Sequence, residues 1–142
     1  DKSMFNPKKN LEKIRKFTYG ISSLLTKNIL VVEDDETTLS YLNLILKKAG
    51  HHVTLARSGR EALSKLTKEP NIDTVIIDYV MPEMSGVELL EKIKDVPAQK
   101  FVMTGYLLEY LREMGTINKI LDLGATIVEK PFSIQYLIFK HG

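Results

Sequence analysis

TVIIDYVMPEMSG, residues 74–86, is the stretch of sequence that decides the fold of this chain. Its first four residues, Thr74–Ile77, are all β-branched, which is typical of a strand buried on both faces of a sheet. A carboxylate, Asp78, follows directly. We interpret Asp78–Gly86 as a loop because it contains proline and glycine. The stretch therefore predicts a buried strand with a carboxylate at its carboxyl end.

Four further short apolar runs flank this stretch, and amphipathic stretches alternate with them. In Glu36–Ala49, for example, Leu39, Leu42 and Leu46 recur at helical spacing. Strands that alternate with helices at short intervals indicate βαβ units. We therefore expect an α/β fold, a doubly wound parallel sheet of five strands with helices on both faces. Besides Thr74–Ile77, the predicted strands are Asn28–Val32, His52–Ala56, Lys100–Thr104 and Ala125–Val128.

The later helices are predicted from caps and periodicity. Ser58 can cap a helix after the second strand, and Val87–Lys94 is helical. Tyr106–Leu123 is a long amphipathic stretch that Gly115 interrupts, and a short last helix is expected near Ser133–Phe139. His51 and His52, which precede the second strand, are interpreted as surface residues.

The composition of the 142 residues is that of one ordinary globular domain. Cysteine is absent, so disulfides and thiolate chemistry are excluded, which fits a reducing compartment. No apolar run approaches the ~20 residues that a membrane helix needs. We expect a cytoplasmic protein that does not insert into a membrane.

The charge divides the chain into two parts. Residues 1–28 hold seven Lys or Arg and two Asp or Glu, a balance of +5, whereas residues 29–142 hold thirteen and sixteen, a balance of −3. We interpret residues 1–27 as a basic amphipathic linker helix with a solvated charged face, and residues 28–142 as the functional domain. Direct nucleic-acid binding is not expected. We interpret Asp1–Ser3, ahead of Met4, as the remnant of a tag.

Polar residues gather where the predicted strands end. Glu33–Asp35 follows the first strand, Asp78 the third, and Lys130 follows the fifth, while Thr104 ends the fourth. The carboxyl ends of parallel strands share one edge, so we expect these side chains to meet there. Crowded carboxylates are unfavourable, and a hard divalent cation such as Mg²⁺ resolves the conflict. Asp78 could then accept a phosphoryl group whose oxygens Lys130 and Thr104 contact.

These residues resemble the receiver domains of bacterial two-component response regulators. The resemblance covers residues 28–142 and implies the flavodoxin-like fold of the chemotaxis regulators, with strand order 2-1-3-4-5. It also implies a phosphohistidine on a sensor histidine kinase or phosphotransfer protein as the donor. The output would be a changed surface for a downstream protein or a second copy, and the domain would act as a switch rather than as an enzyme. The matching runs are ILVVEDDE (29–36), ARSGREAL (56–63), VIIDYVMPEMSG (75–86), FVMTG (101–105) and EKPF (129–132).

The resemblance also implies a set of metal ligands. The family's acidic pair falls on Glu33 and Asp34, with Asp34 the direct Mg²⁺ ligand. Asp78 matches the phosphoacceptor, which also binds the metal, and the backbone carbonyl of Val80 matches the third protein ligand. Asp35 then flanks the site and is expected to cap the first helix.

A second set of residues matches the positions that contact the phosphoryl group. Thr104 matches the switch hydroxyl, Gly105 a backbone contact, and Lys130 the basic partner. Tyr106, together with Val80, would shield the phosphoryl group from water. Ile127 stands where many receivers carry an aromatic residue that reports phosphorylation.

Two other functions stay open. A pseudo-receiver would have the same fold but bind partners without phosphoryl transfer. The complete set of acidic, hydroxyl and basic residues argues against it, while Ile127 and the long segment after Thr104 keep it possible. A phosphohydrolase acting through an aspartyl phosphate would need a cap over its substrate, and no insertion of that size is present.

Overall fold

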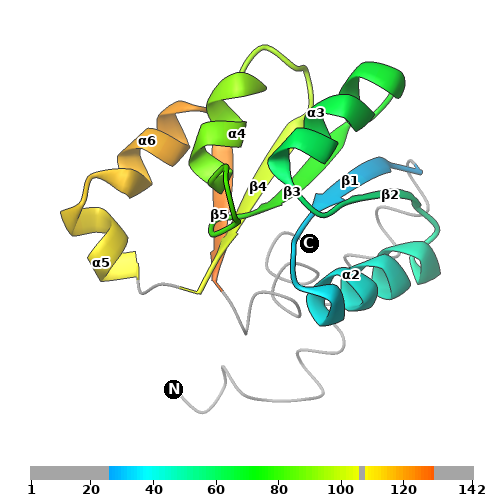
Figure 1. Ribbon diagram of the computed structural model, residues 1–142, viewed down its shortest axis with the longest axis horizontal. Coiled ribbons are helices and arrows are strands. Elements are labelled where there is room, and N and C mark those ends of the chain that lie inside the picture. Colours follow the sequence, from blue (N-terminus) through cyan, green and yellow to red (C-terminus); the bar gives the residue numbers. More distant parts are fainter. Residues whose placement is uncertain (1–25, 106–107, 130–142) are drawn as a thin grey trace.

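The computed structural model describes residues 26–105 and 108–129. Its five strands form one parallel sheet in the order β2-β1-β3-β4-β5 (Figure 1), which confirms the predicted fold class and strand order. Since β2 and β3 lie on opposite sides of β1, the chain changes direction at β1, and the ends of β1 and β3 form the switch point of the sheet. The strands are β1 (Asn28–Val32), β2 (His52–Ala56), β3 (Thr74–Asp78), β4 (Gln99–Thr104) and β5 (Ala125–Glu129).

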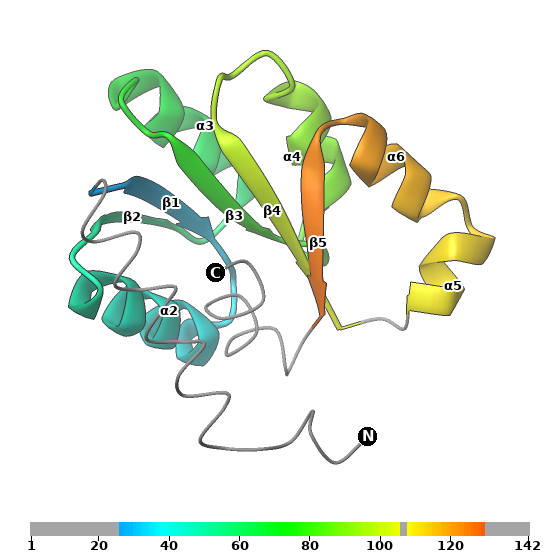
Figure 2. The ribbon, with the colours of Figure 1, turned by 180° about the vertical axis from the view of Figure 1, so that it is seen from behind.

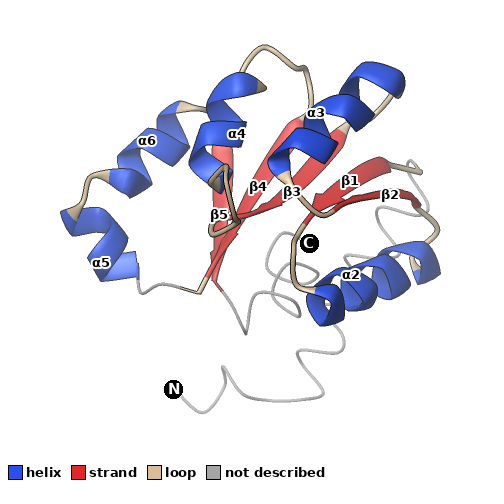
Figure 3. Ribbon diagram, in the orientation of Figure 1, coloured by secondary structure: helices blue, strands red, loops and turns tan. Residues whose placement is uncertain are grey.

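Helices cover both faces of this sheet, as predicted. α2 lies on one face, and α3, α4 and α6 lie on the other, an arrangement visible from both sides in Figures 1 and 2 and by element type in Figure 3. In the part of the chain that is described, none of the helices has the length and apolar character needed to cross a bilayer. The helices are α2 (Glu36–Lys48), α3 (Gly59–Lys68), α4 (Gly86–Lys92), α5 (Leu108–Glu113) and α6 (Thr116–Asp122).

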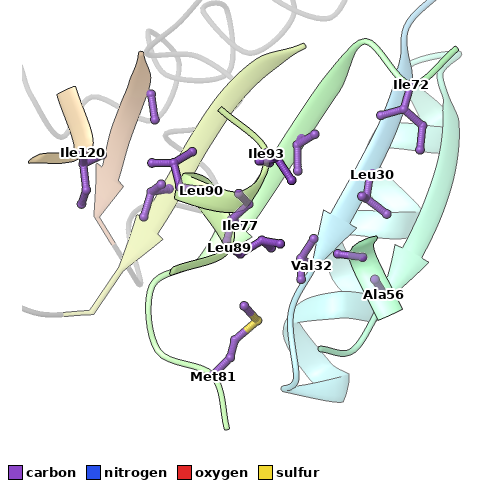
Figure 4. Packing of buried hydrophobic residues seen from close by; sticks show 14 residues of the cluster. Leu30, Val32, Ala56, Ile72, Ile77, Met81, Leu89, Leu90, Ile93 and Ile120 are labelled. Carbon is purple, nitrogen blue, oxygen red and sulfur yellow. The ribbon is translucent and has the colours of Figure 1, made fainter. Parts of the chain in front are cut away.

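Alternate residues of each central strand bury against the two helical layers. On β1, Leu30 belongs to the apolar cluster that contains residues of α3, α4 and α6, whereas Val31 belongs to the cluster that contains residues of α2. Figure 4 shows side chains of the first cluster, among them Ile77 of β3 and Leu89 of α4. Fully burying such a side chain contributes roughly 1.5–3 kcal/mol, so the two layers hold the strand ends in fixed positions.

The predicted boundaries differ from the observed ones by one or two residues. β3 includes Asp78, which was predicted to begin the loop, because Asp78 still pairs with Met103 of β4. α4 ends at Lys92, two residues early, where the buried Ile93 is the C-cap. The predicted break at Gly115 is confirmed, since this glycine separates α5 from α6. The amino-terminal segment up to residue 25 and the predicted last helix lie outside the described residues.

The prediction that His51 is a surface residue is wrong. The imidazole is 6% exposed, and its Nδ1 accepts a hydrogen bond of 3.0 Å from the backbone N–H of Lys27. The cause is the turn after α2, where the N–H of His51 donates to the carbonyl of Leu46 and folds the ring inward. His52 is exposed, as predicted.

Candidate functional site

Three carboxylates converge at the carboxyl ends of β1 and β3. One oxygen each from Glu33, Asp34 and Asp78 lies within 4.8 Å of the others. The strand register explains the meeting, because Val32 pairs with Ile77 and the next residue of each strand is acidic. The expectation that acids from two strands crowd together at this edge is therefore met.

Glu33 is fully buried, with none of its surface exposed. Its carboxylate accepts a hydrogen bond of 3.1 Å from the backbone N–H of Asp34, and the N–H of Asp35 lies 3.5 Å away. Its own N–H donates to the carbonyl of Ala56 at 3.0 Å. Burying a carboxylate is costly unless donors surround it, so the backbone after β1 is shaped around this side chain.

The two acids that follow Glu33 have different roles. Asp34 is exposed and contributes to the carboxylate cluster. Asp35 is the N-cap of α2, and its Oδ2 accepts hydrogen bonds from the N–H and the hydroxyl of Thr38 at 2.9 and 2.7 Å. The helix therefore engages Asp35, as predicted, and Glu33 and Asp34 are the two acids whose carboxylates lie near Asp78.

Backbone hydrogen bonds and close packing fix the loop that follows Asp78. Asp78 is 6% exposed, and the N–H of the next residue, Tyr79, donates to the carbonyl of Met103 at 2.7 Å. The N–H of Gly86 donates to the carbonyl of Tyr79 at 2.9 Å, and a Cβ on Gly86 would lie 2.4 Å from the carbonyl oxygen of Asp78. Only glycine permits this approach. Val80, in the same loop, is 52% exposed.

The remaining predicted residues fall into two groups. Thr104 is fully buried at the end of β4, next to the strand that ends in Asp78, and Gly105 after it is exposed. Ile127 is partly buried and packs on the cluster that faces α4 and α6. Tyr106 and Lys130 lie outside the described residues, so their predicted positions near Asp78 stay predictions.

Sequence reasoning missed an ion pair near this edge. Arg57, directly after β2, pairs with Glu36 in the first turn of α2, and both side chains are exposed. Hydrogen bonding to Glu36 raises the pKa of the Arg57 guanidinium above its ordinary value. The only sequence signal was the position of Arg57 at a strand end, where a charged residue is common.

The donor set of the cluster fits a hard divalent cation. Three carboxylates whose oxygens approach within 4.8 Å repel one another, and two of the three are almost fully buried. Oxygen ligands of this kind are those that Mg²⁺ prefers. The arrangement can thus hold a cation beside a buried carboxylate, Asp78.

Comparison with known proteins gives a consistent result. A model of the response regulator receiver domain matches residues 29–140. Response regulator RR06 of Streptococcus pneumoniae serotype 2 is 35% identical over 112 residues, which cover 78% of this chain and 49% of the relative. The two-component response regulator ORR5 of rice, Oryza sativa subsp. japonica, is 41% identical over 68 residues, 48% of this chain and 51% of the relative. The chain thus spans about half the length of the curated relatives it matches.

A solved structure has the same fold. The CheY-like response regulator receiver domain protein from Methanospirillum hungatei JF-1 superimposes with a TM-score of 0.70 and 33% sequence identity, over 82% of this chain and 90% of that one. Similarity in sequence and in fold thus extends over the strands whose ends carry the carboxylates. With its acidic cluster at the switch point of a 2-1-3-4-5 sheet, the chain belongs to the response regulator receiver domain family of two-component systems.

Proposed function

We propose that this receiver domain takes a phosphoryl group onto Asp78 from a phosphohistidine of a sensor histidine kinase or phosphotransfer protein in the cytoplasm. The observation that carries the proposal is the convergence of Glu33, Asp34 and Asp78 within 4.8 Å at the carboxyl edge of the sheet. In the transfer, a carboxylate oxygen of Asp78 forms a bond to phosphorus while the phosphorus–nitrogen bond of the donor breaks. The donor imidazole keeps the electron pair of that bond.

The carboxylates of Glu33, Asp34 and Asp78 and the backbone carbonyl of Val80 would hold Mg²⁺. When bound, Mg²⁺ supplies positive charge that offsets the carboxylates and a phosphoryl oxygen. Asp78 is positioned for its role by backbone hydrogen bonds of the residue that follows it and by the close packing of Gly86. A nucleophile held in this way loses little freedom when the donor arrives.

Three further residues would contact the transferred group. The hydroxyl of Thr104, the backbone N–H of Gly105 and the ammonium of Lys130 would each meet a phosphoryl oxygen, and Tyr106 would limit the access of water. The role of Lys130 rests on its sequence motif, EKPF, because the residue lies outside the described residues.

The consequence of phosphorylation would be a change of surface. A phosphoryl group adds charge, which biases the loops around it between arrangements that are close in energy. The domain would therefore be a switch that a downstream protein or a second copy recognises, and not an enzyme that turns over a separate substrate. Direct contact with nucleic acid is not part of this proposal.

The test is chemical labelling of the chain by a small phosphodonor. The protein is incubated with acetyl phosphate, with Mg²⁺ or with EDTA, and its intact mass is measured. We expect the wild type to gain one phosphoryl adduct with Mg²⁺ and none with EDTA. Asp78→Asn should gain none under either condition. Asp95→Asn, which changes an exposed carboxylate in the segment before β4, is the control and should be labelled like the wild type.

Amide spectra with beryllofluoride, an analogue of the phosphoryl group, give a second readout. Shifts around Asp78 and Thr104 that vanish in Asp78→Asn would support a switch. A folded protein with neither adduct nor shifts would overturn the proposal in favour of a pseudo-receiver that binds partners without phosphorylation.

A further inference from the structure

A polar cavity of about 520 Å³ lies at the amino-terminal edge of the sheet. It is formed where β1 and β2 begin and where the turns after α2 and α3 meet, so it lies at the opposite end of the strands from the carboxylate cluster. The residues of its lining that matter here are Lys47, His51, Glu69 and Asn71. None of them has a role in the proposed phosphoryl transfer.

His51 lines this cavity, and its ring carries a hydrogen-bond donor whose position is fixed. Its Nδ1 accepts the backbone N–H of Lys27 at 3.0 Å, so in the neutral ring the proton is on Nε2. The side chain is 6% exposed and lines the cavity, and no group of residues 26–105 and 108–129 accepts a hydrogen bond from Nε2. Nε2 is also not among the fully buried unpaired atoms of the described residues, so part of its surface is accessible.

The tautomer of His51 decides which ligands the cavity can take. A metal ion needs a lone pair on Nε2, which would move the proton to Nδ1 and direct it at the N–H of Lys27. A ligand that accepts a hydrogen bond can bind the ring in this tautomer, with the proton on Nε2. Burial lowers the pKa of His51, more than the opposing effect of Asp73 raises it, which favours the neutral ring. An acceptor in the cavity would satisfy a nearly buried N–H group.

The lining carries one cationic and one anionic side chain, those of Lys47 and Glu69. Lys47 is an exposed residue that lines the cavity. The nearby carboxylates already have donors, because Glu69 accepts from the hydroxyl of Thr54 at 3.2 Å, and Asp73 accepts from the N–H of Asn28 at 3.0 Å. Three carbonyls of the last turn of α2 are likewise engaged by the N–H groups of the turn that follows it, those of Ile45, Leu46 and Lys47. The Nε2–H of His51 and the ammonium of Lys47 therefore remain as donors for a ligand that accepts hydrogen bonds.

We propose that this cavity binds a small oxyanion, a carboxylate or a phosphate, through the Nε2–H of His51 and the ammonium of Lys47. The same ring holds the backbone of Lys27, whose carbonyl also accepts from the N–H of His52 at 3.0 Å. Lys27 joins the basic amino-terminal segment to β1. An oxyanion bound here would therefore strengthen the point at which that segment enters the domain.

The test is a titration of the full chain with inorganic phosphate and, separately, with acetate, without Mg²⁺ and at constant ionic strength. Amide spectra and the ring nitrogens of His51 are followed. We expect saturable shifts at Gly50, His51 and Asn71, with dissociation constants on the order of 1 mM. Saturation by phosphate alone, by acetate alone or by both supports the site and tells which oxyanion it prefers.

Four variants test the hydrogen-bond donor and the positive charge separately. In His51→Asn the side-chain oxygen can still accept from Lys27 but no donor stands at the Nε2 position, so binding should weaken about five- to tenfold. Lys47→Met should weaken it as well, whereas Lys48→Met, an exposed lysine outside the cavity lining, should leave it unchanged. Asp78→Asn should also leave it unchanged, which separates this site from the phosphoryl site.

Two results would overturn the inference. One is shifts that rise linearly with anion concentration and are equal in all variants, which indicates non-specific association. The other is saturable shifts confined to Asp78 and Thr104, which would place the anion at the opposite edge of the sheet.

Discussion

At the scale of single residues, two serine–glycine pairs look alike in sequence but differ in what they touch. Ser58 and Ser85 each cap a helix by accepting from a backbone N–H at 3.1 Å. Each is followed by a buried glycine, Gly59 in α3 and Gly86 in α4. The contacts of the two glycines therefore decide which one the site depends on.

We predict that Gly86→Ala destabilises the domain more than Gly59→Ala. A Cβ at Gly86 would meet the backbone oxygen of Asp78 at 2.4 Å, whereas at Gly59 it would meet the sulfur of Met84 at 2.5 Å, and a methionine side chain can rotate away. Gly86→Ala should cost about 1–3 kcal/mol in urea unfolding and slow labelling of Asp78. Equal costs in the two variants would show that the loop below Asp78 yields as easily as a side chain.

His51 gives a pH dependence whose sign follows from its burial. Desolvation lowers its pKa from the ordinary value of 6.5, Lys27 and His52 lower it further, and Asp73 opposes them. The unfolded chain then binds a proton more readily than the folded one. The stability that His51 contributes is thus fully present above pH 6.5 and is lost as pH falls through the folded pKa.

The measurement is the free energy of unfolding of wild type and His51→Asn between about pH 5 and 8. The difference between the two proteins removes the titration of the other groups. We expect the wild type to lose stability relative to the variant as pH falls below 6.5. A difference that is constant with pH would mean that His51 titrates alike in both states.

At the scale of elements, the segment between β4 and β5 consists of two short helices because of one glycine. Gly115 has φ of +75°, and it ends α5 with a 3.0 Å hydrogen bond to the carbonyl of Arg112. The break lets both Leu111 of α5 and Ile120 of α6 be fully buried. One continuous helix would have to direct these side chains differently.

We predict that Gly115→Ala lowers the free energy of unfolding by about 1–2 kcal/mol, the cost of a left-handed conformation for an L-residue. A Cβ here meets nothing within 4 Å, so no steric clash contributes. Gly115→Asn should cost less, because asparagine adopts this conformation more readily. If alanine proved neutral in urea unfolding, the left-handed turn would not be needed for the packing of α5 and α6.

The sequence predicted best those elements whose own composition determines their structure. Thr74–Ile77 is β-branched throughout, and its neighbours are equally apolar, so burial on both faces followed from composition. The ends were less predictable, because Asp78 joins β3 only through its pairing with β4. The burial of His51 depends on how the turn after α2 packs, and nothing in the local sequence signals this.

At the scale of the whole molecule, the carboxylate cluster was predictable because topology creates it. Once a parallel sheet was expected, the residues after β1 and β3 had to share an edge. The division of the tandem acids was predicted only from the family resemblance, and the hydrogen bond from Asp35 to the first turn of α2 agrees with it. The roles of Tyr106 and Lys130 stay predictions.

The same cluster should link the stability of the entire domain to Mg²⁺. Folding brings one oxygen each of three carboxylates within 4.8 Å, while the unfolded chain keeps them apart, so only the folded state brings these ligand atoms together. A ligand that binds only the folded state stabilises it by about 2.7 kcal/mol at one hundred times its dissociation constant. We therefore expect Mg²⁺ to raise, and EDTA to lower, the midpoint of urea unfolding.

Asp34→Asn distinguishes this linkage from a general effect of salt. Replacing the exposed member of the cluster relieves repulsion, so the variant should be more stable than the wild type in EDTA, yet gain less from Mg²⁺. Asp95→Asn, an exposed acid outside the cluster, should respond to Mg²⁺ as the wild type does. If all three proteins gained equally from Mg²⁺, the cation would be acting on the overall charge of the molecule, and the cluster would not be its binding site.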